Sequence, residues 1–372
     1  MRLDPPSSDV PRGGLEEPTV RPVVGRRGGM RAVHRIAWLG AVLVSCEATE
    51  DAAPDLEPAR RDYALYCALC HGDEGQGYVA DGANALAHPD FLAAASDQLL
   101  RRAIVRGRQG TPMSGWGLEW GGPLDDAGVA GLVALMRSWQ TRPNLSLGTE
   151  AGMGQPGLGE AVYAVHCEHC HGPRGAGSTY MSLADPGFLA DASDGYLRYA
   201  VAKGRAGTPM PAFETTLNAS QIDDVVALIR SWQRPLDGST PALPSMDISD
   251  ALLNPGGLPP LEFGLSDRFI SVEQLKRAYD AAESFIVIDA RAPGDYVGGH
   301  IQGAVSVPFY AVSDYLDQLP TDVWIVTYCG CPHAASEAAA DALFAAGYSQ
   351  VRVLDEGLDL WIELGYPTEA GP

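Results

Sequence analysis

The 372-residue chain has few basic residues: 26 Lys and Arg stand against 47 Asp and Glu, for a formal net charge of −21. A surface of this sign repels phosphate backbones, so we expect no nucleic-acid partner. The acidic surface either docks a basic redox partner or serves solubility alone. The composition, 46% hydrophobic and 20% charged, is that of a globular protein, and the length predicts two or three domains.

The chain also has few cysteines, and the sequence assigns each of the seven a role other than a structural disulfide. Four lie in two C-x-x-C-H motifs, two form a C-x-C pair near the end, and one follows a short apolar run. These cysteines are Cys46, Cys67, Cys70, Cys167, Cys170, Cys329 and Cys331. The chain is therefore not a disulfide scaffold.

Long hydrophobic runs are absent, since the apolar stretch at residues 36–44 is too short to cross a bilayer. Two arginines precede it, as in an export signal. It leads into LVSC, ending at Cys46, which resembles the lipobox of bacterial lipoproteins. The resemblance implies a signal region over residues 1–46 and lipidation of Cys46; a plain secretory signal is the alternative. Residues 1–29 hold acids and prolines that export signals avoid, so we expect translation to start at Met30.

The chain matches itself at a spacing near one hundred residues. YCALCHG at residues 66–72 recurs as HCEHCHG at residues 166–172, and RGRQGTPM, VALMRSWQ and the segment after FLA recur as well. Each copy is typical of helices joined by glycine loops. We expect a first repeat over residues 58–142 and a second repeat over residues 157–234, joined by a Gly- and Pro-rich linker at residues 143–156.

The C-x-x-C-H spacing has a chemical reason. Cys67 and Cys70 share one helix face, so their thiols can bond the two vinyl groups of one haem while His71 turns towards the iron. The second copy supplies Cys167, Cys170 and His171. A thioredoxin-like dithiol would need a βαβ context and no histidine, and zinc would need further ligands, of which the first repeat offers only His88. The sequence therefore predicts two covalent haem c groups.

Two methionines complete the pattern, because cytochromes c commonly hold iron between His and Met. Met113 and Met210 occupy the same repeat position, each in GTPM, whereas a lone methionine usually serves packing. Met136 aligns with an isoleucine and is expected in the core. Met181 is a rival ligand for the second haem.

By these motifs both repeats resemble class I c-type cytochrome domains, small helical folds wrapped around haem. The resemblance implies two axial ligand pairs, His71 with Met113 and His171 with Met210. An iron held on both faces has no position for substrate, so such haems transfer electrons. His166 and His169, which flank the second motif, are either rival ligands or solvent-facing residues.

The sequence pattern changes after a Pro- and Gly-rich linker at residues 235–267. Apolar segments then alternate with helical patterns, which predicts a parallel sheet covered by helices. Over residues 268–369 the chain resembles the rhodanese family, through DARAPGDYVGGHIQGAVSVP and LDEGLDLWIELGYP. Asp295 and Glu356 depart from the usual Glu and Gly. Three residues at signature positions are expected to support the fold: Asp289, Arg291 and His300.

The resemblance places a reactive cysteine after the fourth strand, on a loop whose backbone N–H groups and following helix cradle an anionic persulfide. Cys329 holds that position, and Pro332 suits the first helical turn. The loop CGCPHAAS lacks the arginines of loops that accept thiosulfate or phosphate, so phosphatase activity is not expected. It carries a second thiol, Cys331, and His333 as the nearby candidate cation.

Three roles stay open for this loop: Cys329 as a sulfurtransferase nucleophile with Cys331 as a resolving thiol, a reducible disulfide switch, or an idle docking domain. We expect a multidomain protein, two all-α cytochrome c domains followed by an α/β rhodanese-like domain. It would act in the bacterial periplasm, tethered by lipid, as an electron carrier between redox partner proteins. Coupling to a reduced-sulfur compound at Cys329 is the sharper hypothesis; a dihaem carrier with an idle appendage is the alternative.

Overall fold

The computed structural model describes one compact unit of the chain, within Pro54–Pro372. The described residues are 55–79, 82–108, 111–148, 154–177, 180–236, 238–330 and 333–372. The predicted signal region with Cys46 lies outside them, as do Cys331 and Pro332. Within these ranges, no helix combines the length and apolarity needed to cross a bilayer.

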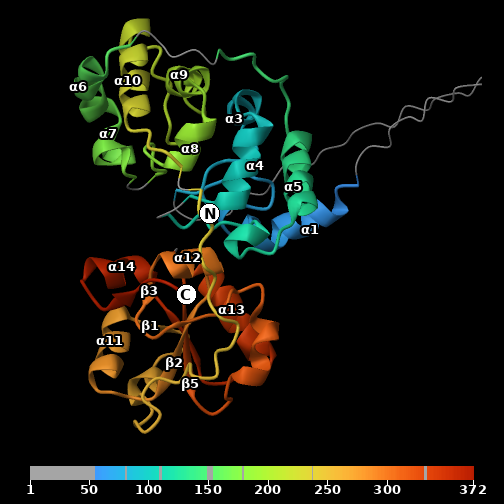
Figure 1. Cartoon of the computed structure of the whole chain (residues 1–372), viewed down its shortest axis with the longest axis vertical. Coiled ribbons are helices and arrows are strands. Elements are labelled where there is room, and N and C mark those ends of the chain that lie inside the picture. Colours follow the sequence, from blue (N-terminus) through green and yellow to red (C-terminus); the bar gives the residue numbers. More distant parts are fainter. Residues whose placement is uncertain are drawn as a thin grey trace, which may run out of the picture. The chain divides into compact units, whose positions relative to one another are not determined.

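The first repeat is helical, as predicted. Its elements are α1 (Glu57–Tyr66), α2 (Ala68–His71), α3 (Pro89–Ala94), α4 (Asp97–Arg106), the 3-10 turn η1 (Leu118–Trp120) and α5 (Asp126–Ser138). Side-chain caps start the longer helices: Ser96 accepts from Leu99 N at 3.1 Å and Asp125 accepts from Gly128 N at 2.8 Å. Helix α1 packs against α5 (Figure 1), so the segment that leads into the C-x-x-C-H motif is fixed on the core.

The second repeat follows the same order. Its elements are α6 (Pro156–His166), α7 (Glu168–His171), η2 (Pro173–Gly175), α8 (Pro186–Asp191), α9 (Asp194–Lys203) and α10 (Ala219–Ser231). A capping box starts α10: Asn218 and Gln221 exchange side-chain and backbone hydrogen bonds at 3.0 Å. Helix α6 lies along α10 (Figure 1), as α1 lies against α5 in the first repeat.

Equivalent buried contacts hold both repeats. Tyr63 donates its hydroxyl to Gly72 O at 2.7 Å, and Tyr163 donates to Gly172 O at 2.8 Å. Each tyrosine also packs edge to face on the tryptophan that ends its repeat, with 5.0 Å between ring centroids in both cases. These contacts tie the start of each motif to the last helix, and they fix the backbone directly after each motif histidine.

The C-terminal domain is a parallel α/β structure. Its elements are η3 (Leu261–Leu265), β1 (Phe269–Ile270), α11 (Val272–Asp280), β2 (Phe285–Asp289), α12 (Pro293–Gly298), β3 (His300–Ile301), β4 (Val305–Ser306), η4 (Val312–Asp314), η5 (Leu316–Gln318), β5 (Trp324–Tyr328), α13 (Ala334–Ala345), β6 (Val351–Leu354), α14 (Gly357–Glu363) and β7 (Thr368–Glu369). The main sheet has the order β1-β6-β5-β2-β4, with every pair parallel. The predicted fold class, a helical region followed by an α/β domain with a parallel sheet, is confirmed.

Strands β2 and β6 are buried along their whole length, and β5 is buried except for the half-buried Trp324, as expected for a parallel sheet covered on both faces. Strand β2 pairs with β5 from Phe285 opposite Trp324 to Asp289 opposite Tyr328. Strand β4 is only two residues long, although Val307 N still donates to Asp289 O at 3.0 Å beyond it. The carboxyl ends of β2, β4 and β5 meet at one edge of the sheet, which we call the carboxyl edge, and Cys329 follows directly after β5.

Candidate functional sites

The first C-x-x-C-H motif stands on its own helical turn. Helix α1 ends at Tyr66, Cys67 closes it by donating its N–H to Tyr63 O at 2.9 Å, and α2 carries the rest of the motif. His71 N donates to Cys67 O at 2.9 Å, which places both thiols on one face of this turn. The two cysteines are half-buried and the His71 ring is buried. The second motif repeats these hydrogen bonds, with a half-buried His171.

The two motif histidines are oriented by backbone carbonyls. His71 Nδ1 lies 2.8 Å from Asn84 O, and His171 Nδ1 lies 3.0 Å from Met181 O. Because a carbonyl oxygen only accepts, Nδ1 carries the proton and Nε2 keeps its lone pair for a metal. Burial lowers the pKa of both histidines, which favours the neutral, ligating form. Met181, the rival ligand, thus contributes its backbone to holding His171.

The first thiol of each motif has a raised pKa, unlike the thiols of redox-active C-x-x-C pairs. Burial, with a smaller contribution from Asp62, raises the pKa of Cys67 to about 12. Burial, followed by the Cys170 charge, raises the pKa of Cys167 to about 11. Reactive C-x-x-C pairs instead have lowered thiol pKa values. The raised pKa values of Cys67 and Cys167 therefore argue against thioredoxin-like exchange at these motifs.

The two methionines lie in loops of the same construction. Arg108 N donates to Met113 O at 2.8 Å, Met113 N donates to Thr111 Oγ1 at 3.2 Å, and Thr111 Oγ1 donates to Arg108 O at 2.7 Å. The second repeat has 2.8, 3.2 and 2.8 Å at the equivalent positions. Both methionine side chains are half-buried. Together with the histidine tautomer, these loops fit a haem c with one His and one Met ligand in each repeat.

The other sequence-predicted candidates lie elsewhere. His169 is exposed, and His166 packs edge to face on Phe213 at 5.9 Å between ring centroids. His88 caps α3: its Nδ1 accepts from Asp90 N at 3.2 Å, and its Nε2 lies 3.0 Å from Ala206 O. Met136 is buried in the core, as expected from its alignment with an isoleucine.

Replacing Met113 or Met210 with Ala tests the ligand assignment. Each change should lower the intensity of the charge-transfer band of Met-ligated ferric haem, because one of the two methionine ligands is lost. It should also allow carbon monoxide to bind that iron in the ferrous state, because alanine cannot replace the thioether ligand. Optical titration with carbon monoxide measures both effects. Met136→Leu, a volume-conserving core change costing under about 1.5 kcal/mol, is the matched control and should leave both signals unchanged. A full band in Met113→Ala would exclude Met113 as a ligand.

The two repeats contact each other through equivalent residues. The motifs of the sequence did not predict these contacts. Arg108 lies over the Phe188 ring at 5.1 Å, and Arg205 lies over the Phe91 ring at 4.8 Å. Arg108 also pairs with Asp185 at 3.3 Å. Both arginines belong to the methionine loops, so each loop contacts the other repeat. The repeat alignment contains the signal, because it pairs the two arginines with each other and the two phenylalanines likewise.

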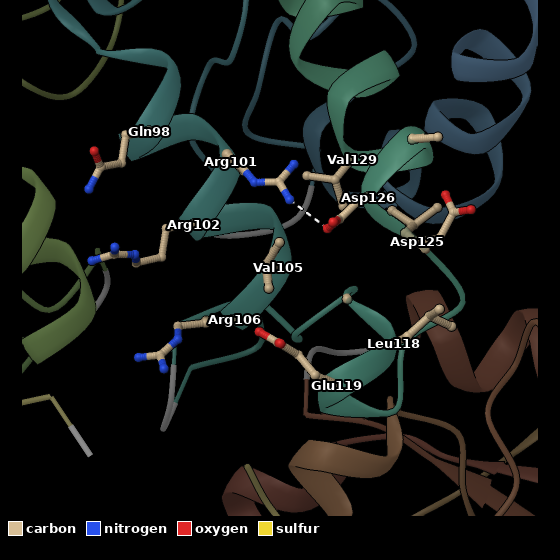
Figure 2. Close-up of a pocket in the computed structure, with 13 residues that line it drawn as sticks. Gln98, Arg101, Arg102, Val105, Arg106, Leu118, Glu119, Asp125, Asp126 and Val129 are labelled. Carbon is tan, nitrogen blue, oxygen red and sulfur yellow. Dashed lines mark hydrogen bonds and ion pairs between the residues drawn. The ribbon is translucent and has the colours of Figure 1, made fainter. Parts of the chain in front are cut away.

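An open cleft on the outer face of α4 holds none of the predicted site residues (Figure 2). Three arginines follow one another along this helix. Arg101 pairs with Asp126 at 2.6 Å, Arg102 pairs with an aspartate of the second repeat at 2.9 Å, and Arg106 lies 5.4 Å from the Trp120 ring centroid. The three arginines therefore join α4 to the neighbouring segments, which accounts for this cluster of positive charge on an acidic protein.

Cys329 lies at the carboxyl edge of the sheet in the C-terminal domain and is 1% exposed. Its Sγ is 3.4 Å from Ser336 Oγ, on the first turn of α13, and its carbonyl accepts from Leu358 N at 3.0 Å. The thiol therefore faces the start of the helix that follows the loop, as the family resemblance implies for a nucleophile. Its partner in the C-x-C pair, Cys331, lies outside the described residues.

The nearby cationic side chains are held by carboxylates. Arg291 forms a buried fork with Asp289, with Nε–Oδ1 at 2.9 Å and Nη2–Oδ2 at 2.5 Å, and Tyr328 donates to the same carboxylate at 2.7 Å. His333 Nε2 lies 2.8 Å from Asp355 Oδ1. Its ring stacks against a phenylalanine of β1 at 4.6 Å.

His300 is a structural residue in this geometry. Its ring stacks on Tyr296 with centroids 3.7 Å apart, and its Nδ1 lies 2.8 Å from Tyr296 O. Asp289, Arg291 and His300 thus pack and pair inside the domain, in agreement with the fold-supporting role expected for them.

Comparison with known proteins names the two kinds of module. Through its C-terminal domain the chain belongs to the rhodanese-like family, whose "Rhodanese-like domain" matches residues 271–364, and it contains a c-type cytochrome domain, since "Cytochrome C oxidase, cbb3-type, subunit III" matches residues 154–229. Thiosulfate sulfurtransferase GlpE of Pseudomonas entomophila is 36% identical over 89 residues, which cover 24% of this chain and 79% of that protein. GlpE of Pseudomonas aeruginosa is 32% identical over 108 residues, covering 28% and 94%.

The helical region has its own relative. The cbb3-type cytochrome c oxidase subunit FixP of Bradyrhizobium diazoefficiens is 30% identical over 173 residues, which cover 44% of this chain and 57% of that protein. The chain thus spans little more than half of FixP. Among solved structures, a rhodanese-like domain from Anabaena is 29% identical, covers 28% of this chain and 80% of its own, and gives a TM-score of 0.27.

Proposed function

We propose that the chain transfers electrons through two covalently bound haem c groups, one in each repeat. Bound haem c supplies a site that accepts and releases one electron. In the first repeat Cys67 and Cys70 would attach it, and His71 and Met113 would ligate its iron. In the second repeat these roles fall to Cys167, Cys170, His171 and Met210. The observation that carries this proposal is the repeated set of hydrogen bonds around both histidines and both methionines.

The chain's own residues would prepare each site. The carbonyl partners of the histidines fix the ligating tautomer, and the buried tyrosine hydroxyls hold the backbone after each motif. The threonine of each methionine loop holds the methionine backbone. The electron donor and acceptor would be redox proteins, and the acidic net charge fits a basic docking partner. This module class and the lipobox-like segment ending at Cys46 support a lipid-tethered position outside the cytoplasm.

The C-terminal domain would handle sulfur at Cys329. The thiolate attacks the sulfane sulfur of a donor such as thiosulfate: an S–S bond to Cys329 forms, the donor's S–S bond breaks, and sulfite leaves with the bonding pair. That transfer is redox-neutral. Joining hydrosulfide to the thiolate instead gives the persulfide, one proton and two electrons, a number that matches two one-electron acceptors. Cys331 would relay or resolve the persulfide, and His333 is the cation closest in sequence.

A second candidate, an electron carrier with an idle docking or redox-switch domain, is favoured by one observation. Arg291 and His333, the two basic residues that the sequence places near the Cys329 loop, are paired with Asp289 and Asp355. An anionic donor would therefore rely on backbone N–H groups for binding.

Cys329→Ser separates the two candidates. In the purified ferric protein under anaerobic conditions, hydrosulfide should reduce the haems, and this reduction should fall about 100-fold or more in Cys329→Ser because serine cannot form a persulfide. Ascorbate reduction should be equal in both proteins, which controls for haem content. If hydrosulfide reduced the haems equally well in Cys329→Ser, the second candidate would hold: an electron carrier whose C-terminal domain acts independently.

A further inference from the structure

The carboxyl edge of the C-terminal domain contacts the first repeat. Four aromatic side chains meet there. Tyr66, directly before Cys67, packs on Trp116 at 5.4 Å and on Tyr310 at 5.6 Å between ring centroids. Phe309 packs edge to face on Trp116 at 6.2 Å. We call these residues, Tyr66, Trp116, Phe309 and Tyr310, the aromatic junction.

The aromatic junction lies between the haem-binding motif of the first repeat and the sheet edge that carries Cys329. On the first repeat it begins next to the C-x-x-C-H motif and ends at Trp116, three residues after Met113. On the C-terminal domain Phe309 and Tyr310 follow β4 at the carboxyl edge, where Phe309 N donates to Ala290 O at 3.0 Å. Helix α13, which follows the Cys329 loop, also lies against α2. Both the motif helix and the methionine loop therefore contact the edge that carries Cys329.

A second line of contacts runs beside the rings. Gly330, directly after Cys329, lies so close to Arg291 that a Cβ added there would be 3.5 Å from Arg291 Cδ. Arg291 and Ser114, the neighbour of Met113, both lie close enough to the Asp295 carboxyl to lower its pKa. Burial raises the pKa of Asp295 to about 6 against the lowering effects of Arg291 and Ser114. The contact thus continues from the cysteine loop to the methionine loop.

The C-terminal domain comes close to the backbone of the first repeat at two places. Tyr310 donates its hydroxyl to Gly121 O at 3.1 Å. There is no room for a side chain at Gly294, at the start of α12, because a Cβ there would come within 2.7 Å of Trp120 O. At Gly298, on the same helix, a Cβ would meet nothing within 4 Å. Close approach at Gly294 is a property of a fitted interface rather than of two domains joined only by a linker.

We propose that the C-terminal domain docks on the first repeat through the aromatic junction, and that this docking makes the first repeat, not the second, the redox neighbour of the Cys329 site. The inference rests on the proposed function for its redox part and on the geometry for its docking part. Electrons released at Cys329 would enter the chain at the haem site of the first repeat, across packed aromatic rings, and the second repeat would receive them through the Arg–Phe contacts.

Gly294→Ala and its matched control Gly298→Ala test the docking in the full haem-loaded chain. Gly294→Ala should speed amide exchange of residues 114–122 about tenfold, since the added methyl separates the surfaces, while Gly298→Ala should leave it within about twofold of the native rate. Tyr310→Ala is a second variant with the same expectation, because it removes the junction from the other side. Equal exchange in all four proteins would overturn the docking, whatever the haems do.

The redox part has its own measurement in the same proteins. Hydrosulfide-dependent haem reduction should slow about tenfold in Gly294→Ala and stay native in Gly298→Ala, with ascorbate reduction equal in both. A native rate in Gly294→Ala, despite faster exchange, would overturn the role of the first repeat as redox neighbour. If native protein shows no hydrosulfide-dependent reduction, the sulfur-coupling hypothesis fails and takes this redox role with it, while the exchange measurement still decides the docking.

Discussion

A chain with Cys67 and Cys70 both changed to Ala should lose one porphyrin in mass, and a chain with Cys167 and Cys170 changed should lose one as well. The physical reason is that thioether bonds are covalent, so each intact motif keeps its own group through denaturation. Intact-mass analysis of the exported protein measures this directly. The quadruple variant should have the mass of the bare polypeptide and a large loss of helical structure, because apolar surface prepared for a porphyrin would be left without it.

Cys329→Ser is the control for this experiment and should keep the full native mass, since its thiol lies outside both motifs. Native protein with the mass of the bare polypeptide would refute both haem sites. Loss of two groups from a single-motif variant would show instead that the repeats do not mature independently.

Asp289→Ala should be the most destabilising single change in the C-terminal domain. Asp289 is fully buried and accepts from Arg291 and from Tyr328. Removing the carboxylate leaves the half-buried Arg291 without its counter-charge, which costs about 3–5 kcal/mol of the free energy of unfolding. Amide exchange of the β2 and β5 residues under native conditions measures this for the C-terminal domain separately from the repeats.

Asp341→Ala is the matched control. Its carboxylate pairs with Arg268 at 2.8 Å, but 64% of the Asp341 side chain is exposed, so its loss should cost no more than about 1 kcal/mol. If Asp289→Ala cost as little as Asp341→Ala, the buried fork would be dispensable for the fold.

The sequence carries most of what is local in this molecule. The i, i+3 cysteines, the duplicated GTPM loops and the buried strands predicted the helical repeats and the parallel sheet, because spacing and periodicity encode them. The cap residues show the same local logic: Asn218 and Gln221 form the box that starts α10. The placement of domain boundaries stays a prediction.

Contacts between distant segments were not predictable in this way. Tyr66 and Tyr310 are separated by more than two hundred residues, and neither lies in a repeating pattern that would identify the other. The partners of His333 were also missed, since Asp355 reaches it only once β6 has folded beside β5.

The contact of α13 with α2 has a consequence for biogenesis. On the proposed function, the attachment machinery must reach the motif cysteines of the first repeat, yet the folded C-terminal domain contacts the turn that bears them. We therefore expect maturation to be ordered in time: haem would be attached to the repeat first, and the later-translated domain would dock on it afterwards. A C-terminal domain that docked first would hinder access to the attachment site beside it.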